Sequence, residues 1–186
     1  MIAGRYAGGI ELAEVVRSGF PESVHRGSVV VLGPAGEPVL TAGDPLGAVF
    51  PRSANKLMQA TGMLTAGFAP ANSEELALAA ASHHGEPIHT ERVAAMLRRA
   101  GLAAEALACP PDLPFAEPAR NTVLRSGGGP ERVFMNCSGK HAAMLLTCQA
   151  AGWPTAGYTD PAHPLQRAVT AAVEELSGEQ VAAVGV

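Results

Sequence analysis

The sequence predicts a protein of the α+β class, with strands in the first fifty residues and helices in most of the remainder. Two β-branched runs, 28–32 and 38–42, flank the turn sequence GPAGE and together predict a β-hairpin. From Pro51 onward, helix formers and apolar residues recur between N-cap signals and glycine stop signals. Residues 10–17 are compatible with either a strand or a short helix.

The remaining elements follow from local signals along the chain. Helices are expected over 53–67, from an N-cap at Ser73, from an N-cap at Thr90 to a stop at Gly101, over 140–152, and over 164–178. Residues 105–130 are rich in Pro and Gly and predict an irregular segment. We therefore expect one domain over 1–186, with a strand-rich part at 1–50, a mainly helical part at 51–178 and the start of a strand at 179–186.

Composition narrows the possible partners and the compartment. The net charge is -4 and the basic residues are scattered, which argues against a nucleic-acid binder. Three cysteines are an odd number, so a disulfide framework is not expected and a reducing compartment is. The N-terminus has no signal-peptide core, and no apolar run reaches the roughly 18 to 20 residues that span a bilayer. These observations predict a soluble, cytoplasmic protein without a membrane partner.

The chain contains only two lysines, and each follows a nucleophilic side chain by three residues: Ser53 precedes Lys56, and Cys137 precedes Lys140. On a helix this spacing places both side chains on one face. A serine hydroxyl attacks only when a base takes its proton, and lysine can be that base when burial lowers its pKa, whereas arginine stays protonated. The structural alternative is that Ser53 caps a helix and Lys56 is solvated.

Two further segments carry candidate site residues. Cys137 fits a nucleophile, a metal ligand or a small buried residue, and the polar turn that follows it favours a site. The segment ASHHGEPIH, residues 81–89, contains three histidines but lacks the spacing of a metal motif. A loop with Ser82, His83 and Glu86 is better suited to contact a substrate.

The segments FPRSANK, ASHHGEP, NCSGKHAAML and GWPT, together with the early VVRSGFPESVHRG, resemble the thermolabile, rhizobial-type L-asparaginases, also called asparaginase II. The resemblance runs from about Glu14 to Gln166 and keeps the order of the motifs. It implies a fold like that of the serine β-lactamases and penicillin-binding proteins, an antiparallel sheet with a helical subdomain. It also implies hydrolysis of L-asparagine to L-aspartate and ammonia.

The resemblance assigns roles to individual residues. Ser53 would be the nucleophile, Lys56 its base, and Ser82 a second active-site serine that a distant lysine partners in the family. Arg52, His83 and Asn136 would contact the substrate. Cys137 and Lys140 would help to hold a zinc ion that tunes affinity without being essential for the chemistry, and no organic cofactor is expected. A homodimer is a further expectation.

This sequence departs from the family pattern in two places. Leu57 stands where the family usually has proline, a change that should not affect the chemistry. The chain stops at Val186, where relatives continue with a cysteine ligand, the lysine partner of Ser82 and further strands. On this interpretation the domain is incomplete, and the chain alone is expected to lack part of its site. The alternatives are a glutaminase or penicillin-recognising serine hydrolase of the same fold, and an inactive fragment or binding module.

Overall fold

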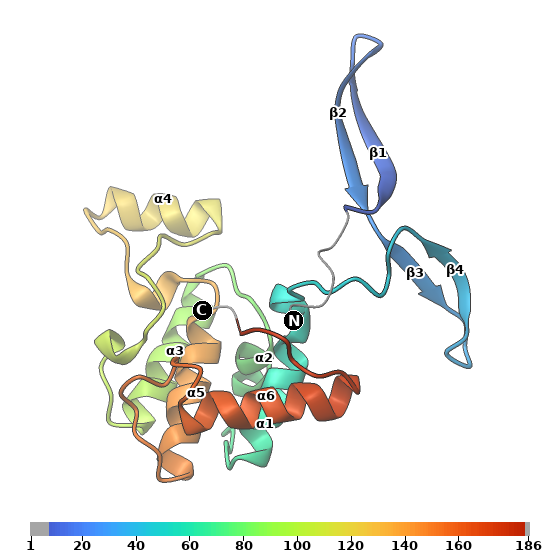
Figure 1. Cartoon of the computed structure of the whole chain (residues 1–186). Coiled ribbons are helices and arrows are strands. Elements are labelled where there is room, and N and C mark those ends of the chain that lie inside the picture. Colours follow the sequence, from blue (N-terminus) through green and yellow to red (C-terminus); the bar gives the residue numbers. More distant parts are fainter. Residues whose placement is uncertain (1–7, 185–186) are drawn as a thin grey trace. The chain divides into compact units, whose positions relative to one another are not determined.

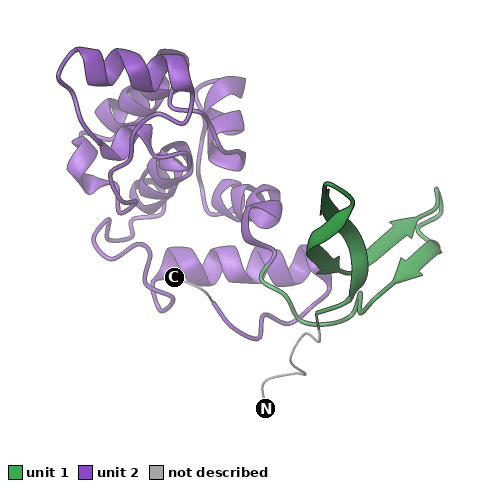
Figure 2. Cartoon of the chain, turned by 90° about the horizontal axis from the view of Figure 1, so that it is seen from above, with its two compact units in different colours: residues 1–50 green, residues 51–186 purple. Residues whose placement is uncertain are grey.

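The computed structural model describes residues 8–184, and the chain divides into two compact units, 1–50 and 51–186 (Figures 1 and 2). Each unit is described by itself. The described residues combine helices with two small antiparallel sheets, which is compatible with the predicted α+β class. The β-lactamase-like arrangement and the grouping of both units into one domain stay predictions.

Unit 1 consists of two β-hairpins. Strands β1 (Ile10–Arg17) and β2 (Phe20–Gly27) pair antiparallel around Ser18 and Gly19, which both have positive φ, at 50° and 77°. Two successive positive φ values are typical of the tight turns whose twist matches a hairpin. Residues 10–17 are therefore a strand and not a helix.

The second hairpin of unit 1 confirms the one predicted from the β-branched runs. Strands β3 (Val29–Leu32) and β4 (Pro38–Ala42) pair antiparallel, with Val29 opposite Ala42. Strand β2 was not predicted, because its sequence FPESVHRG contains proline and four charged or polar positions without a regular alternation. Pro21 is tolerated because a strand in a two-stranded sheet has a free edge that needs no N–H donor.

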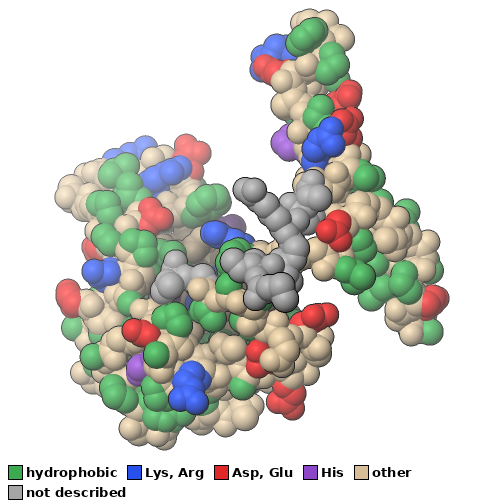
Figure 3. Space-filling model, in the orientation of Figure 1, with side chains coloured by type: hydrophobic (Ala, Val, Ile, Leu, Met, Phe, Trp, Pro, Cys, Tyr) green, Lys and Arg blue, Asp and Glu red, His purple; other side chains and the backbone are tan. Residues whose placement is uncertain are grey.

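Most residues of unit 1 are exposed and the others are half-buried, since none of its described residues is buried. Figure 3 shows hydrophobic side chains along both hairpins, and these include Phe20, Val31 and Val39. A two-stranded sheet is marginally stable by itself in water. The stable core of this chain therefore lies in unit 2.

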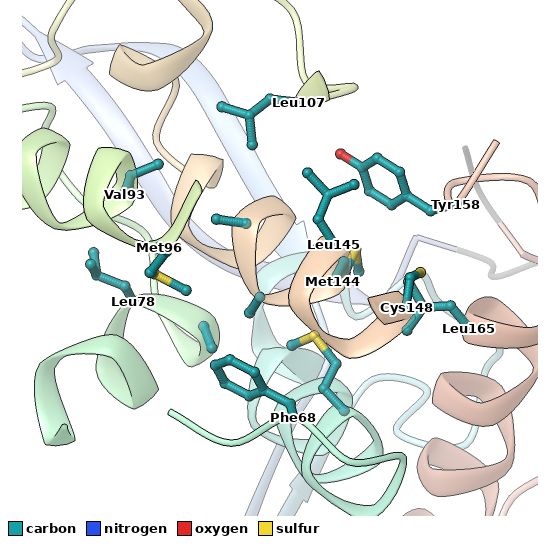
Figure 4. Packing of buried hydrophobic residues seen from close by; sticks show 14 of the residues in the cluster. Phe68, Leu78, Val93, Met96, Leu107, Met144, Leu145, Cys148, Tyr158 and Leu165 are labelled. Atoms are coloured by element: carbon teal, nitrogen blue, oxygen red, sulfur yellow. The ribbon is translucent and has the colours of Figure 1, made fainter. Parts of the chain in front are cut away.

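Unit 2 is helical. Its α-helices are α1 (Lys56–Thr65), α2 (Ser73–Ala80), α3 (Pro87–Arg99), α4 (Glu117–Arg125), α5 (Ser138–Ala150) and α6 (Pro164–Ser177), and its short 3-10 helices are η1 (Arg52–Asn55), η2 (Ala104–Ala106) and η3 (Arg132–Phe134). Helix α5 packs against α1, α2 and α3, and eight of its 13 residues are buried. Figure 4 shows the shared core, in which Leu78 of α2, Val93 of α3 and Leu145 of α5 are labelled.

A glycine allows α5 to approach α2 closely. A Cβ atom built on Gly139 would lie 2.9 Å from the backbone oxygen of Leu78 and 2.8 Å from its Cβ. Side chains are rarely accommodated at such distances without a shift of the backbone. The NCSGK segment therefore contributes packing as well as candidate site residues.

An ion pair also joins α2 to α3. The Glu75 carboxylate is buried and accepts hydrogen bonds from both terminal nitrogens of Arg99, at 2.5 and 2.6 Å, and one from the backbone N–H of Ala71 at 2.8 Å. These bonds lower the pKa of Glu75, with the Arg99 hydrogen bonds as the largest cause. The two helices flank the loop at residues 81–86.

Several predicted helix boundaries need correction. The N-cap of α2 is Asn72, whose Oδ1 accepts from the backbone N–H of Glu75 at 3.0 Å, and not Ser73. Helix α3 begins at Pro87 rather than after Thr90, because proline is favourable in the first turn, where its missing N–H costs nothing. The segment 105–130 is not irregular throughout, since α4 forms within it with Pro118 in its own first turn. The boundaries at Gly101 and Gly178 are confirmed.

The segment after α6 also differs from its prediction. Gly178 ends the helix in the left-handed conformation, and Glu179 to Val184 form no strand, while residues 185 and 186 lie outside the described range. A strand needs a neighbouring strand for its backbone hydrogen bonds. The Val181 N–H instead donates to Glu174 Oε1 at 2.9 Å, back onto α6. Among residues 8–184, no helix combines the length and the apolar character needed to cross a membrane.

Candidate active site

Ser53 and Lys56 lie where η1 passes into α1. Ser53 is exposed in η1, and its backbone carbonyl accepts from the Lys56 N–H. Lys56 is the first residue of α1 and is 6% exposed. Arg52, the predicted substrate contact beside them, is exposed and has a positive φ of 50°, a conformation that non-glycine residues rarely adopt. The serine is therefore open to solvent while the lysine is buried.

The Lys56 ammonium contacts Ser82, which comes from the loop after α2. Lys56 Nζ lies 2.7 Å from Ser82 Oγ and 3.2 Å from the backbone oxygen of Ala81. No hydrogen bond joins Lys56 Nζ to Ser53 Oγ within the described part of the chain. The structure thus brings together Lys56 and Ser82, which lie 26 positions apart and which spacing alone could not connect.

The surroundings of Lys56 favour its neutral form. Burial is the largest influence and lowers the pKa of the Lys56 ammonium. The electrostatic influence of Cys137 raises this pKa, and the positive charge of Lys140 lowers it. Both influences place the NCSGK segment close enough to Lys56 to act on its charge. A lysine that loses its proton more readily than usual is suited to act as a base.

His83 is held inside the protein. It is 4% exposed, and the Gly85 N–H donates to its Nδ1 at 3.1 Å, so the proton of the neutral ring lies on Nε2. Nε2 then donates to Ser138 Oγ at 2.9 Å, and the Ser138 hydroxyl donates to the Val133 carbonyl at 2.9 Å. Burial is the largest of the influences that lower the pKa of His83 to about 4.

This hydrogen-bond chain fixes the loop of Ser82 to the start of α5. The backbone N–H of His83 also donates to the carbonyl of Asn136 at 2.9 Å, while the Asn136 residue is exposed. Both ring nitrogens of His83 are occupied by protein atoms, so the geometry favours a positioning role over the predicted contact with substrate. The substrate contacts of Arg52 and Asn136 stay predictions.

Cys137 and Lys140 lie at the beginning of α5. Cys137 is the N-cap residue, and its Sγ lies 3.1 Å from Met135 Sδ. Lys140 Nζ donates to Gln59 Oε1 of α1 at 3.4 Å. Protein zinc sites use three or four protein ligands, whereas these two residues offer one thiolate and one amine.

Among residues 8–184, no group of three His, Cys, Asp or Glu side chains is placed so that it could hold a metal ion. The described donors are therefore too few to hold zinc by themselves. The predicted zinc ion stays a prediction.

A pair of residues close to Cys137 and Lys140, namely His141 and Tyr158, was not predicted from the sequence. The Tyr158 hydroxyl is buried, accepts from the Ala108 N–H at 2.8 Å and contacts His141 Nδ1 at 2.7 Å. Burial, followed by the charges of Lys140 and Lys56, lowers the pKa of His141 to about 4. His141 follows Cys137 by four residues, a spacing that places two side chains on the same face of a helix. This spacing is the signal in the sequence that could have indicated His141 as a neighbour of the candidate site.

A cavity of 230 Å³ opens beside Ser82. Its walls come from α2, α3 and the loop between them, and they include Ser82, His83, His89, Glu74 and Arg92. A larger cavity of 330 Å³ lies between the start of α3 and α4, and its lining includes Glu86 of the predicted contact loop but neither Ser82 nor Lys56. The smaller cavity is the one of these two that contains Ser82, the residue in contact with Lys56.

Comparison with known proteins agrees with the motifs. The family model described as L-asparaginase II matches residues 13–186. No curated protein matches the chain. The family match confirms the resemblance on which the site residues were assigned.

Proposed function

Because the chain belongs to the L-asparaginase II family, we propose that it hydrolyses the side-chain amide of L-asparagine to L-aspartate and ammonia. The observation that carries the proposal is the contact between Lys56 Nζ and Ser82 Oγ, 2.7 Å long, beside the exposed Ser53. A buried lysine whose pKa is lowered and whose side chain contacts a serine hydroxyl supports the proposal, because serine acyl-enzyme chemistry needs a base that takes the proton of the nucleophile.

In the proposed first step, Ser53 Oγ attacks the amide carbon and its proton moves to neutral Lys56 Nζ. The new C–O bond forms as the C–N bond breaks, and the leaving nitrogen takes the proton from Lys56 and departs as ammonia. In the second step a water molecule attacks the ester and transfers a proton to Lys56. The proton then returns to Ser53 as the C–O bond breaks and L-aspartate is released.

Ser82 has two possible roles in this scheme. As the hydrogen-bond partner of Lys56 it would orient the base, whereas the family resemblance implies that Ser82 is a second active-site serine partnered by a distant lysine. The same contact also makes Ser82 a second candidate nucleophile, because Lys56 Nζ contacts the hydroxyl of Ser82, whereas no hydrogen bond within the described residues joins it to the hydroxyl of Ser53. The two schemes break and form the same bonds and differ only in the serine that is acylated.

Ammonia release by the variants Ser53→Ala and Ser82→Ala tests the proposal. We expect Ser53→Ala to abolish turnover and Ser82→Ala to retain a reduced rate, with Ser126→Ala at the end of α4 as the control that keeps full activity. Mass spectrometry of the acid-quenched enzyme then locates the ester on one serine. Full activity of Ser53→Ala would refute Ser53 as nucleophile, and an ester on Ser82 would support the second scheme.

A parallel assay with L-glutamine separates the asparaginase from the glutaminase that the sequence leaves as an alternative. Failure of the wild-type chain to release ammonia from either amide, under conditions where unit 2 is folded, would refute the proposed function.

A further inference from the structure

The cavity beside Ser82 carries opposite charges on its walls. Glu74 lies in the first turn of α2 and Arg92 lies in the middle of α3, and Arg92 Nη2 donates to Glu74 Oε1 at 3.3 Å. Both side chains line the cavity together with Ser82. One cavity therefore offers a carboxylate, a guanidinium and the hydroxyl that contacts Lys56.

Both charged groups have hydrogen-bonding capacity left for a ligand. A guanidinium has five N–H donors and a carboxylate has about four acceptor positions. Among the described residues, Arg92 is joined to Glu74 by a single contact of 3.3 Å, and the other Glu74 oxygen accepts only the long 3.4 Å bond from Ser73. The pair is also partly exposed, with 38% and 51% of the two side chains accessible. A ligand can therefore reach both charges without breaking a buried ion pair.

A third polar residue, His89, also belongs to the wall of this cavity. Nδ1 of His89, another residue of the cavity wall, is buried and has no hydrogen-bond partner among the described residues. The carboxylate of Glu86 is 3.9 Å away, too far for a hydrogen bond. His89 and Arg92 lie three residues apart and share one face of α3, about 4.5 Å apart along its axis.

The remaining walls and the volume suit a small molecule. Ala77, Leu78 and Ile88 provide apolar surface between the charged residues and Ser82. A volume of 230 Å³ corresponds to about eight water molecules at ~30 Å³ each, which is room for one amino acid.

We propose that this cavity binds the α-ammonium and α-carboxylate groups of the amino acid substrate, with Glu74 on the ammonium and Arg92 on the carboxylate. A zwitterion matches the paired charges of Glu74 and Arg92, and its side-chain amide points toward Ser82. The inference rests on the proposed function and adds two specificity-determining residues that the sequence motifs do not contain.

Two analogues of L-asparagine, each lacking one charged group, test the assignment. Succinamate lacks the α-ammonium, and β-alaninamide lacks the α-carboxylate. We expect Arg92→Gln to raise KM about tenfold or more for L-asparagine and succinamate, and to leave KM for β-alaninamide unchanged. Glu74→Gln should raise KM for L-asparagine and β-alaninamide and leave succinamate unchanged. In each variant kcat should stay within about twofold, since the groups bind ground state and transition state alike.

The matched controls are Arg98→Gln and Glu91→Gln, which remove the same charges from exposed positions of α3 outside the cavity. They should leave KM unchanged for all three amides. Equal changes of KM for all three amides in Arg92→Gln and Glu74→Gln, or no change, would overturn the inference while the proposed function stands.

Calorimetric binding of the product, L-aspartate, gives a readout that does not depend on turnover. We expect wild type to bind L-aspartate and Arg92→Gln to bind it about tenfold more weakly. Binding that depends on Arg92 without any ammonia release would refute the proposed function alone. Absence of both binding and turnover in the folded wild-type chain would overturn both.

Discussion

Acidification should destabilise unit 2 through His83, whose ring is buried and neutral. The pKa of His83 is about 4 in the folded protein, against 6.5 for an ordinary histidine. The unfolded chain therefore binds a proton at a higher pH than the folded chain does. The stability that this group contributes is complete above about pH 6.5 and is lost as the pH falls from 6.5 toward 4.

The size of the effect follows from the two pKa values. One pH unit corresponds to ~1.4 kcal/mol for a group that is protonated only in the unfolded state. The loss of stability develops mainly below pH 6.5, where the unfolded chain is protonated at His83 and the folded chain is not. Between pH 7 and pH 5, His83 alone should therefore lower the free energy of unfolding by about 2 kcal/mol. His141, whose pKa is also about 4, acts in the same direction.

Urea unfolding of the wild type and of His83→Gln at pH 7 and pH 5 measures the contribution. The variant is less stable at pH 7, because it loses the bonds to Ser138 and Gly85, but its stability should fall by about 2 kcal/mol less between the two pH values than that of the wild type. His25→Gln, an exposed change on β2, is the control and should keep the wild-type difference. An identical pH dependence of wild type and His83→Gln would refute the argument that burial keeps this ring neutral.

Three further predictions concern packing, the buried ion pair and the base. Gly139→Ala should destabilise unit 2 by ~1–3 kcal/mol in urea unfolding, because its Cβ would meet α2 at 2.8 Å, whereas Gly129→Ala, with no atom within 4 Å of its Cβ, should have little effect. Arg99→Gln should cost about 2 kcal/mol in the same assay, because it weakens the charged hydrogen bonds on the buried Glu75 carboxylate, and an unchanged unfolding midpoint would contradict this. Lys56→Arg should reduce ammonia release at least about 100-fold while unit 2 stays folded by circular dichroism, because arginine cannot lose its proton at neutral pH; a rate within tenfold of wild type would exclude Lys56 as the base.

Several secondary-structure elements were predicted correctly because they depend on residues that lie close together in the sequence. The hairpin around GPAGE, the helix at 164–178 and the glycine stops at Gly101 and Gly178 follow from turn chemistry and from the periodicity of apolar residues, which neighbouring residues alone determine. Helix α4 was missed because the Pro and Gly content of 105–130 outweighed its weak apolar pattern, and none of its residues is buried.

The candidate site, like the fold, could be predicted only in part from the sequence. Motif order and the two lysines were enough to identify Ser53, Lys56, Ser82, Cys137 and Lys140 as candidates and to indicate the family that the match over residues 13–186 confirms. The motifs could not predict which of these side chains contact one another, because contacts between distant segments depend on how the helices pack.

The sequence by itself therefore determined which types of residue are available for the proposed reaction: a serine three positions before a lysine, and a second serine followed by histidine. Only the tertiary structure decided that Lys56 touches Ser82, that His83 is a buried anchor on Ser138, and that Glu74 and Arg92 share a cavity with Ser82. The physical reason is that burial and low pKa arise from the packing of α1, α2, α3 and α5 around one core. That packing sums many weak long-range contacts, which no single stretch of sequence contains.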